Sequence, residues 1–400
     1  MNISKLFFTL FAGMTFYSTL SLAMPQEADK ISSSRWNYVG KPDFIGNKSL
    51  GYLGLKTYSM AVTSNGIPYL AILFETNRRN FQILATQYNP VTHQWDSLKN
   101  FSTYSMNNIN IAVDPAGVPY IAHIGNGKQI VVMKYDMQQQ QWVSLGSVAS
   151  TSGVFDLGLK IIFDQAGVPY LIYGTNSKKI FVMKYTGKAW LPIQKYISPQ
   201  GEIIGNPKMV ITQTGKIYIA FISTNGQYQS IKVATLTDKG WQLVAKEGLP
   251  SFASYSGSLN DQPISLALDN NGNPYLAYID FSFLQAASLI KFSGKAWKPV
   301  GKYNFTPAFV KEINLVLDSH NTPYLAFTYL NDTFLTRGLM KFDGKDWIND
   351  ASLQPLSPTD NLMRLFFKMT PDNKLYLGYG RCVNKARDDC SMNVLNRQYI

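Results

Sequence analysis

Residues 111–120 read Ile-Ala-Val-Asp-Pro-Ala-Gly-Val-Pro-Tyr, and this stretch decides the fold because the chain repeats it. Each copy is anchored on a tyrosine that returns at steps of 51, 50, 48, 57, 49 and 52 residues: Tyr69, Tyr120, Tyr170, Tyr218, Tyr275, Tyr324 and Tyr376. A period near ~50 residues with short strands in every unit is typical of radial repeat proteins. The 400-residue chain is therefore predicted to form one continuous repeat domain rather than several separate ones.

The second unit shows how one repeat is built. Short alternating or apolar runs at 109–114, 119–124, 129–135 and 141–145 predict four strands, and residues 115–118 predict a tight turn between the first two. Four short strands joined by tight turns make one antiparallel blade of a β-propeller.

The residues at fixed distances before the tyrosines support this prediction. Gly or Asn stands three residues before each one: Gly66, Gly117, Gly167, Gly215, Gly272, Asn321 and Asn373. These residue types tolerate a positive φ, which a hairpin turn with a bulge requires. Asp or Thr, which bonds its own backbone and starts a turn, stands six residues before: Thr63, Asp114, Asp164, Thr212, Asp269, Asp318 and Thr370.

A second series, of tryptophans, gives the same count. Six follow their tyrosines by 20 to 26 residues: Trp95, Trp142, Trp190, Trp241, Trp297 and Trp347. The seventh is Trp36, at the other end of the chain. We therefore predict an all-β, seven-bladed propeller over residues 35–400, in which the N-terminal strand completes the last blade and closes the ring.

Residues 111–120 also resemble the NHL class of propeller repeat. They are similar to exported bacterial repeats that read D-x-x-G-x-P-Y-[VIL]-A-Y, then V-M-K-Y, then a tryptophan. The second part occurs at 132–135, 182–185, 289–292 and 339–342, whereas blades one, four and seven depart from it. The resemblance implies a propeller that serves as a binding module, adhesin, structural part or occasional enzyme. The alternative for the repeated lysines is that they are solvated positions on an outer strand.

The N-terminus is predicted to be an export signal. Lys5 precedes the largely apolar residues 6–22, and Ser21-Leu22-Ala23 is a small-x-small cleavage site. The alternative is an uncleaved membrane anchor, for which the stretch is short. We expect residues 1–23 to be the signal, 24–34 a linker, and the product to be secreted or periplasmic without a membrane span. Cys382 and Cys390 are then predicted to form a disulfide.

Charge bears on the partner. The formal net charge is +12, and it falls to +11 when residues 1–23 are removed. This balance favours anionic partners such as acidic glycans, surface polymers or nucleic acid; the alternative is that the basic charge serves solubility alone. The partner expected is an acidic glycan or another protein, and we do not expect nucleic acid. No metal site or cofactor is predicted, because the histidines are only His93, His123 and His320, and no nucleotide, hydrolase or zinc motif occurs.

The loops between second and third strands are predicted to form a basic, aromatic rim on one face. The candidate binding residues are Arg78, Arg79, Lys128, Lys178, Lys179, Tyr228, Phe283, Phe334, Arg337 and Arg381. The alternative is that these polar loops are simply solvated. The sequence thus favours a monomeric binding module over an enzyme. The rival functions are a glycan hydrolase or lyase that uses rim carboxylates such as Asp280, Asp332, Asp388, Asp389 and Glu202, and a structural or host-interaction protein.

Overall fold

The structure is a computed structural model, in which residues 34–400 form one compact unit. It describes residues 35–46, 54–77, 80–103, 108–125, 129–148, 158–175, 179–194, 202–224, 228–245, 249–253, 263–331, 334–350, 352–353, 361–382 and 389–398. The predicted signal and linker at 1–34 lie outside these ranges. Within them, no helix is long and apolar enough to cross a membrane.

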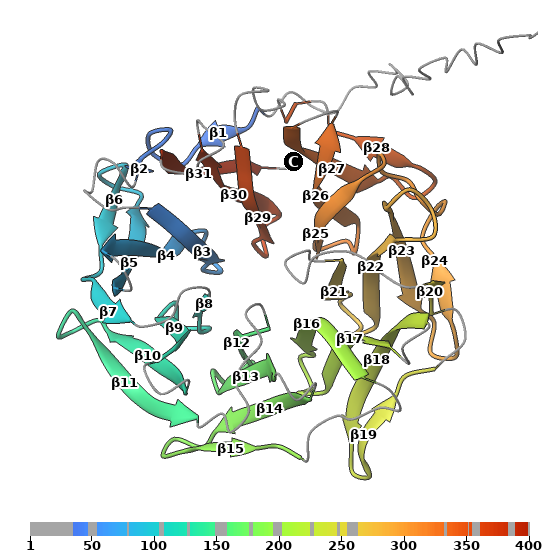
Figure 1. Ribbon diagram of the computed structural model, residues 1–400, viewed down its shortest axis with the longest axis horizontal. Coiled ribbons are helices and arrows are strands. Elements are labelled where there is room, and N and C mark those ends of the chain that lie inside the picture. The colour runs from blue at the N-terminus through green and yellow to red at the C-terminus, as the bar shows by residue number, and fades with distance from the viewer. Residues whose placement is uncertain are drawn as a thin grey trace, which may run out of the picture. The chain divides into compact units, whose positions relative to one another are not determined.

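The described residues form seven antiparallel blades around a ring (Figure 1). Blade 1 consists of β3 (Gly54–Val62), β4 (Pro68–Asn77), β5 (Asn80–Asn89) and β6 (Gln94–Ser97). Blade 2 consists of β8 (Ile109–Val113), β9 (Pro119–Ile124), β10 (Ile130–Asp136) and β11 (Gln141–Val148). Blade 3 consists of β12 (Lys160–Phe163), β13 (Pro169–Gly174), β14 (Ile180–Tyr185) and β15 (Trp190–Pro192).

Blades 4 to 6 repeat this order. Blade 4 consists of β16 (Glu202–Ile211), β17 (Ile217–Thr224), β18 (Tyr228–Thr237) and β19 (Gly240–Leu243). Blade 5 consists of β21 (Ile264–Leu268), β22 (Pro274–Asp280), β23 (Ala286–Phe292) and β24 (Trp297–Pro299). Blade 6 consists of β25 (Val310–Leu317), β26 (Pro323–Asn331), β27 (Phe334–Phe342) and β28 (Trp347–Asn349). Two further strands pair at the ends of third strands, β7 (Phe101–Thr103) on β5 and β20 (Ser251–Ala253) on β18.

The seventh blade joins the two ends of the chain. It consists of β29 (Asn361–Met369), β30 (Lys374–Cys382) and β31 (Cys390–Gln398), followed by β1 (Asn37–Tyr38), with Asn37 opposite Asn396. A second N-terminal strand, β2 (Ile45–Gly46), also pairs with β31. The predicted ring closure is confirmed, and Trp36 packs against the core of this blade.

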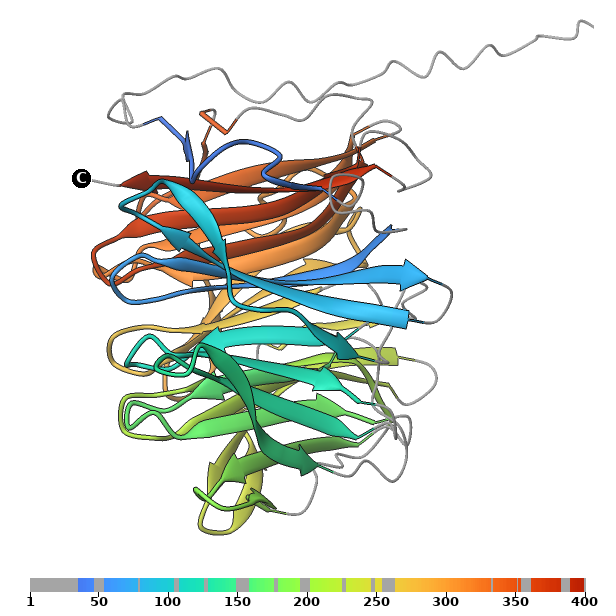
Figure 2. The same ribbon diagram turned by 90° about the vertical axis from the view of Figure 1, so that its left-hand side faces the viewer.

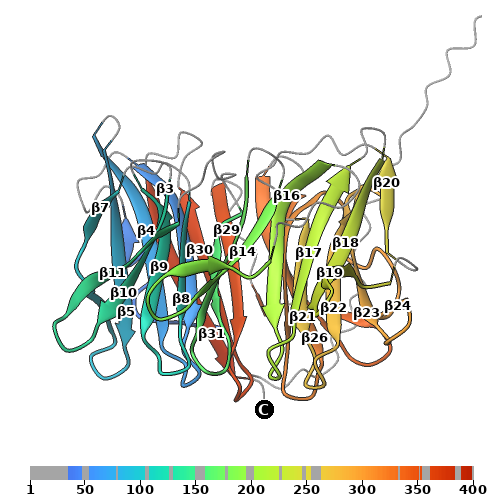
Figure 3. The same cartoon turned by 90° about the horizontal axis from the view of Figure 1, so that it is seen from below.

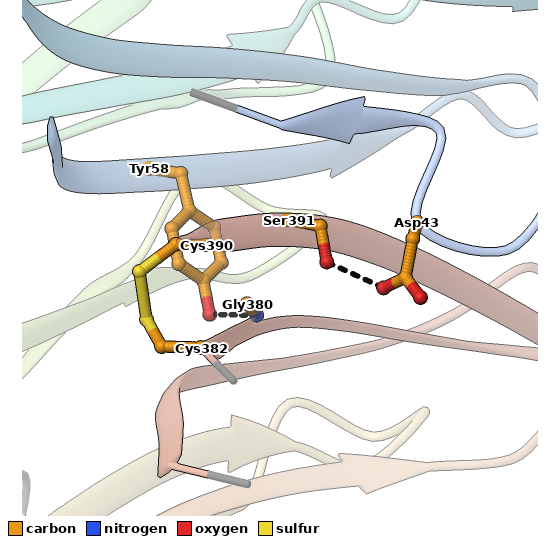
Figure 4. The surroundings of a disulfide bond; sticks show 6 residues. All are labelled: Asp43, Tyr58, Gly380, Cys382, Cys390 and Ser391. Carbon is orange, nitrogen blue, oxygen red and sulfur yellow. Dashed lines mark hydrogen bonds between the residues drawn. A yellow bond between two sulfur atoms is a disulfide. The ribbon is translucent and has the colours of Figure 1, made fainter. Parts of the chain in front are cut away.

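The predicted Cys382–Cys390 disulfide is confirmed, with an S–S distance of 2.01 Å, and it joins β30 to β31. Figure 4 shows it beside Tyr58, which reaches from β3 of blade 1 into blade 7. The Tyr58 hydroxyl accepts the Gly380 N–H at 2.5 Å and donates to the Arg364 carbonyl. The Ser391 hydroxyl donates to Asp43 of the N-terminal segment (Figure 4). The β30–β31 hairpin is therefore hydrogen-bonded both to blade 1 and to the N-terminal segment.

The predicted turn chemistry is also confirmed. All seven Gly or Asn residues that precede the tyrosines by three have a φ between 63° and 82°. The aspartate or threonine six residues before the tyrosine accepts backbone N–H groups of its own turn, as Asp114 does from Ala116 at 3.0 Å and Val118 at 2.9 Å. These short turns lie at the lower ends of the strands in Figure 3.

The hydrophobic core lies between blades. Each apolar cluster draws on two neighbouring sheets, and Figure 2 shows blade 1 (blue) between blade 7 (red) and blade 2 (teal). Four tryptophan indoles donate to a carbonyl of the preceding blade: Trp95 to Val39 (2.9 Å), Trp142 to Leu98 (2.8 Å), Trp297 to Val244 (3.4 Å) and Trp347 to Val300 (3.0 Å). In each case the acceptor stands three residues after the tryptophan of that preceding blade. The tryptophan repeat is thus a device for blade-to-blade packing.

The blades with Asp six residues before the repeated tyrosine differ from those with Thr there in the residue that faces the tyrosine. We call the first kind aspartate blades and the second kind threonine blades. In the four aspartate blades a third-strand lysine lies over the repeated tyrosine, at 4.8 to 5.5 Å from the ring centre: Lys134, Lys184, Lys291 and Lys341. In the three threonine blades the residue opposite the tyrosine is Gln87, Thr235 or Asn396. The best-formed set is in blade 5, where the Lys291 ammonium lies 2.9 Å from Asp269. The repeated lysines therefore have a packing role as well as partial exposure.

Candidate functional site

The inner strand of every blade lines a central cavity. Its volume is about 710 Å³, and its lining includes residues of β3, β8, β12, β16, β21, β25 and β29. These strands face the axis of the ring in Figure 1. It reaches the turns between first and second strands, where Ser64, Pro115, Gln165 and Gln213 contribute. A cavity of this size accommodates a small ligand or the end of a chain.

One register position sets the chemistry of this channel. The residue ten before each repeated tyrosine lies on the inner strand: Ser59, Asn110, Lys160, Lys208, Ser265, Asn314 and Phe366. Side chains alternate across a strand, so residues eight and twelve before the tyrosine share the same face. On that face, Lys368 stands at minus eight, and Glu312 and Arg364 at minus twelve.

Ser and Asn at this register tie neighbouring blades together. The Asn110 amide donates to Ser59 Oγ at 3.0 Å, and Asn110 Oδ1 accepts the Ile161 N–H at 2.9 Å. On the other side of the ring, Ser265 Oγ accepts the Leu315 N–H at 3.0 Å. These side chains form an inter-blade belt and leave their hydrogen-bonding groups satisfied.

Blades 3 and 4 interrupt the belt with Lys160 and Lys208. Lys160 reaches across the lumen, so that its ammonium lies 6.0 Å from the ring centre of Phe366 in blade 7. Lys368 and Arg364 of β29 are close enough to couple electrostatically to both lysines. Within the described ranges, the charged groups of Lys160, Lys368 and Arg364 have no hydrogen-bond or ion-pair partner.

The protonation of these lysines reflects their confinement. Burial, reinforced by Lys208, Arg364 and Lys368, holds the pKa of Lys160 well below its usual value. Burial also lowers the pKa of Lys208 to about 8, although Glu312 opposes the shift. The pKa of the Lys368 ammonium is lowered by partial desolvation as well, although much of this residue remains exposed to solvent. Each shift means that a charged ammonium is less well solvated here than it would be in water.

Glu312 is the carboxylate of the group. Its side chain is 7% exposed, and Oε2 accepts the Leu365 N–H at 2.9 Å. Oε1 has no hydrogen-bond partner in the described part of the chain. Burial raises the pKa of Glu312, while the Leu365 N–H and the nearby cations act against that shift. Four cations and this carboxylate give the group a formal charge of +3.

The two aspartates in the cavity lining do not neutralise the group. Asp114 accepts two N–H groups of its turn, and Asp164 accepts the Val168 N–H at 2.9 Å and the Tyr170 hydroxyl at 3.3 Å. Both stand at the turn end of the inner strands, six residues beyond the minus-twelve register. The deep part of the channel is therefore an electropositive site.

The structure places six of the ten predicted rim residues only in part or not at all. Arg78, Arg79, Lys128 and Lys178 lie outside the described residues, Tyr228 begins β18 with its side chain undescribed, and Lys179 is half-buried beside β14. The rim remains a prediction at these positions. The same holds for Asp332 and Asp388, which also lie outside the described residues, and for the Glu202 side chain.

The other four rim residues are placed. Phe283 is 54% exposed, and Phe334 is half-buried at the start of β27. Arg337 is 7% exposed, with its guanidinium 4.0 Å from the ring centre of Tyr379, so it packs between blades 6 and 7. An Arg381 nitrogen lies 3.8 Å from Asp43 in the N-terminal segment. The described residues contain no group of three His, Cys, Asp or Glu side chains that could hold a metal ion.

The channel residues were not among the candidates chosen from sequence. A signal for them exists, because the belt position recurs at the same steps as the tyrosines and is polar in six of seven blades. It escapes notice because one polar residue within a short apolar strand resembles ordinary alternation.

Comparisons with known proteins identify the fold. No family model and no curated protein matches the chain. Among solved structures, the polysaccharide lyase Uly1 matches with a TM-score of 0.52 and 12% identity, covering 83% of this chain and 88% of that one. An arginine-to-alanine triple mutant of AofleA from Arthrobotrys oligospora (TM-score 0.46, 8% identity, 81% and 92% coverage) and a protein of unknown function from Dyadobacter fermentans (0.48, 11%, 92% and 98%) are more distant. At such identities the similarity concerns the fold alone.

Proposed function

We propose that this protein is an exported binding propeller whose central channel holds the anionic group of an acidic carbohydrate. The observation that carries the proposal is the group of four cations in the lumen, which faces a single carboxylate, Glu312. Of these cations, Lys160, Lys368 and Arg364 make no side-chain hydrogen bond or ion pair in the described part of the chain. Confined charges without partners destabilise the folded protein. A bound carboxylate or sulfate would supply the missing counter-charge.

The replacement of belt residues supports a functional role for these lysines. Blades 1, 2, 5 and 6 use Ser or Asn at the same register to bond the next blade, whereas blades 3 and 4 do not. Positions that break a local stabilising pattern are where function is expected. The predicted rim would engage the remainder of a longer ligand.

Export is part of the same proposal. The Cys382–Cys390 disulfide supports an oxidising compartment, and the predicted signal at 1–23 and the resemblance to exported propeller repeats point the same way. A secreted or periplasmic protein meets acidic polysaccharides directly. Because one of the structures with a similar fold is that of a polysaccharide lyase, turnover is assayed alongside binding.

The test is calorimetric titration of the purified protein with glucuronate and with sulfate, at low ionic strength, because salt screens such contacts. The double variant Lys160→Met and Lys208→Met should reduce affinity at least tenfold, since each removes a lumen cation. The matched control is Lys298→Met and Lys302→Met, which makes the same change in net charge at two exposed lysines. The control should bind as the wild type does.

Equal binding by both double variants would refute the channel as the site. Absence of binding to either anion would refute the proposed function. Oligosaccharide release from an acidic polysaccharide, abolished by the channel variant, would replace the binding module by the enzyme alternative.

A further inference from the structure

Lys160 combines three features of an amine that reacts with carbonyl compounds. It lines a cavity large enough for a ligand, its ammonium has no hydrogen-bond or ion-pair partner among described residues, and it faces an aromatic ring, that of Phe366, at 6.0 Å from the ring centre. An amine is nucleophilic only when it is neutral, and apolar surroundings together with neighbouring cations favour the neutral form.

The charged neighbours of Lys160 could bind the anionic group of a ligand that reacts with it. Lys208 comes from the adjacent blade, and Lys368 and Arg364 come from β29 of blade 7. The carboxylate of Glu312 in blade 6 favours the charged form of Lys160, but all three cations act on it as like charges. They therefore disfavour its protonation, which is also the direction of its lowered pKa, and they would hold the anionic group of a ligand close to it.

We propose that Lys160 forms a reversible imine with a ligand that carries both an aldehyde or ketone and an anionic group, such as the open-chain form of a sugar acid. This inference rests on the anion site proposed above and adds a covalent step to it. A channel closed on all sides by blades favours a ligand that enters by its end, and the end of an acidic glycan carries the aldehyde of its reducing sugar.

The step balances without any co-reactant. The neutral Lys160 nitrogen adds its electron pair to the carbonyl carbon, and one of its two protons passes to the carbonyl oxygen to give a carbinolamine. The second nitrogen proton then passes to the hydroxyl, which leaves as water, and a C=N bond replaces the C=O bond. Hydrolysis reverses each change, so the ligand is released unaltered. Lys208, Lys368 and Arg364 keep the anionic group in place throughout.

The test uses two small aldehydes of similar size, anionic glyoxylate and uncharged glycolaldehyde, on the full-length protein at neutral pH. Borohydride reduction converts any imine to a stable secondary amine, and peptide mass spectrometry locates it. With glyoxylate, Lys160 should be modified at least tenfold faster than the exposed Lys298. With glycolaldehyde this preference should largely disappear, because the three cations no longer recruit the reagent.

A variant tests the role of the neighbours. Lys208→Met leaves Lys160 in place but removes one like charge, so modification of Lys160 by glyoxylate should slow at neutral pH and recover as the pH is raised. Equal modification of Lys160 and Lys298 by glyoxylate would overturn the inference. So would a preference for Lys160 that is the same with both aldehydes. If glucuronate and sulfate bind by calorimetry while Lys160 stays unmodified, the anion site stands and the imine does not.

Discussion

At the scale of single residues, the channel lysines lower the stability of the fold and add positive charge to the channel. Where Ser59, Asn110 and Ser265 bond the neighbouring blade, Lys160 and Lys208 place an ammonium in a confined lumen. A pKa lowered by burial is also a statement about folding, because the unfolded chain holds the same proton more tightly. We therefore predict that replacing one of these two lysines by an uncharged residue makes the protein more stable.

Lys208→Met should raise the free energy of unfolding at neutral pH by about 2 kcal/mol, with allowance for water in the channel. The folded pKa is about 8 and the reference value is 10.5. Below pH 8 both states hold the proton and the full destabilisation by Lys208 is present. As the pH rises from 8 to 10.5, the folded state loses its proton first and the destabilisation disappears. Denaturant titrations at neutral pH and near pH 10 measure this, with the exposed Lys298→Met as control.

A gain in stability that does not change with pH would contradict this interpretation. It would show that apolar packing of the methionine side chain stabilises the variant, rather than removal of the Lys208 charge from the channel.

The exchange of Asp and Lys for Thr among blades gives a second residue-scale prediction. Asp269 bonds its turn and pairs with Lys291, whereas Thr212 of blade 4 bonds its turn and faces no such lysine. Asp269→Thr should therefore destabilise the protein by about 1–2 kcal/mol and Lys291→Thr by about 1 kcal/mol. The double variant reproduces the blade 4 pair and should cost about 0.5–1 kcal/mol less than the two single losses combined.

Chemical denaturation of the four proteins at one pH completes this cycle. Strict additivity would show that the aspartate and the lysine act independently, and that their joint replacement in three blades has another cause.

At the scale of elements, the inner hairpin is defined by its turn. Gly117 has a φ of 82°, and a Cβ added there would meet Thr63 at 3.6 Å, an ordinary contact. Any effect of substitution is thus conformational rather than steric. Gly117→Ala should cost about 1–2 kcal/mol, as L-residues do in the left-handed region, whereas Gly117→Asn should cost less, because Asn321 and Asn373 hold this position in blades 6 and 7.

Thermal unfolding of these two variants of blade 2 provides the comparison. If alanine and asparagine lower the midpoint equally, side-chain tolerance of positive φ does not explain why only Gly and Asn occur here.

Much of the element scale could be predicted from the sequence, because turn residues and indoles are specified by local geometry that repeats. The disulfide followed from two cysteines in a chain predicted to be exported. The channel group could not be predicted in the same way. Lys160 and Lys368 are 208 residues apart in sequence, and their proximity follows only from the diameter of the closed ring. A rim of loops, by contrast, is visible in sequence, yet Arg337 shows that a loop-adjacent cation can serve packing instead.

At the scale of the whole molecule, the ring makes a site that no blade contains. The cations come from blades 3, 4 and 7, and Glu312 from blade 6, so opening the ring should separate them. Closure depends on the short N-terminal segment, through β1 and β2 on β31 and the Trp95 bond to Val39.

A chain that begins at residue 35 should unfold in one cooperative transition, because it retains β1 and β2. A chain that begins at residue 47 should melt at a lower temperature and associate, because the outer edge of β31 loses its partner and an unpaired strand edge invites pairing with another copy. Its glucuronate affinity should fall as well, since the ring that positions the cations is open. Circular dichroism melts and size-exclusion chromatography of the two chains, side by side, measure both effects. Equal midpoints and equal elution volumes would mean that blade 7 is stable with three strands and that its Cys382–Cys390 hairpin, rather than the N-terminal segment, secures the ring.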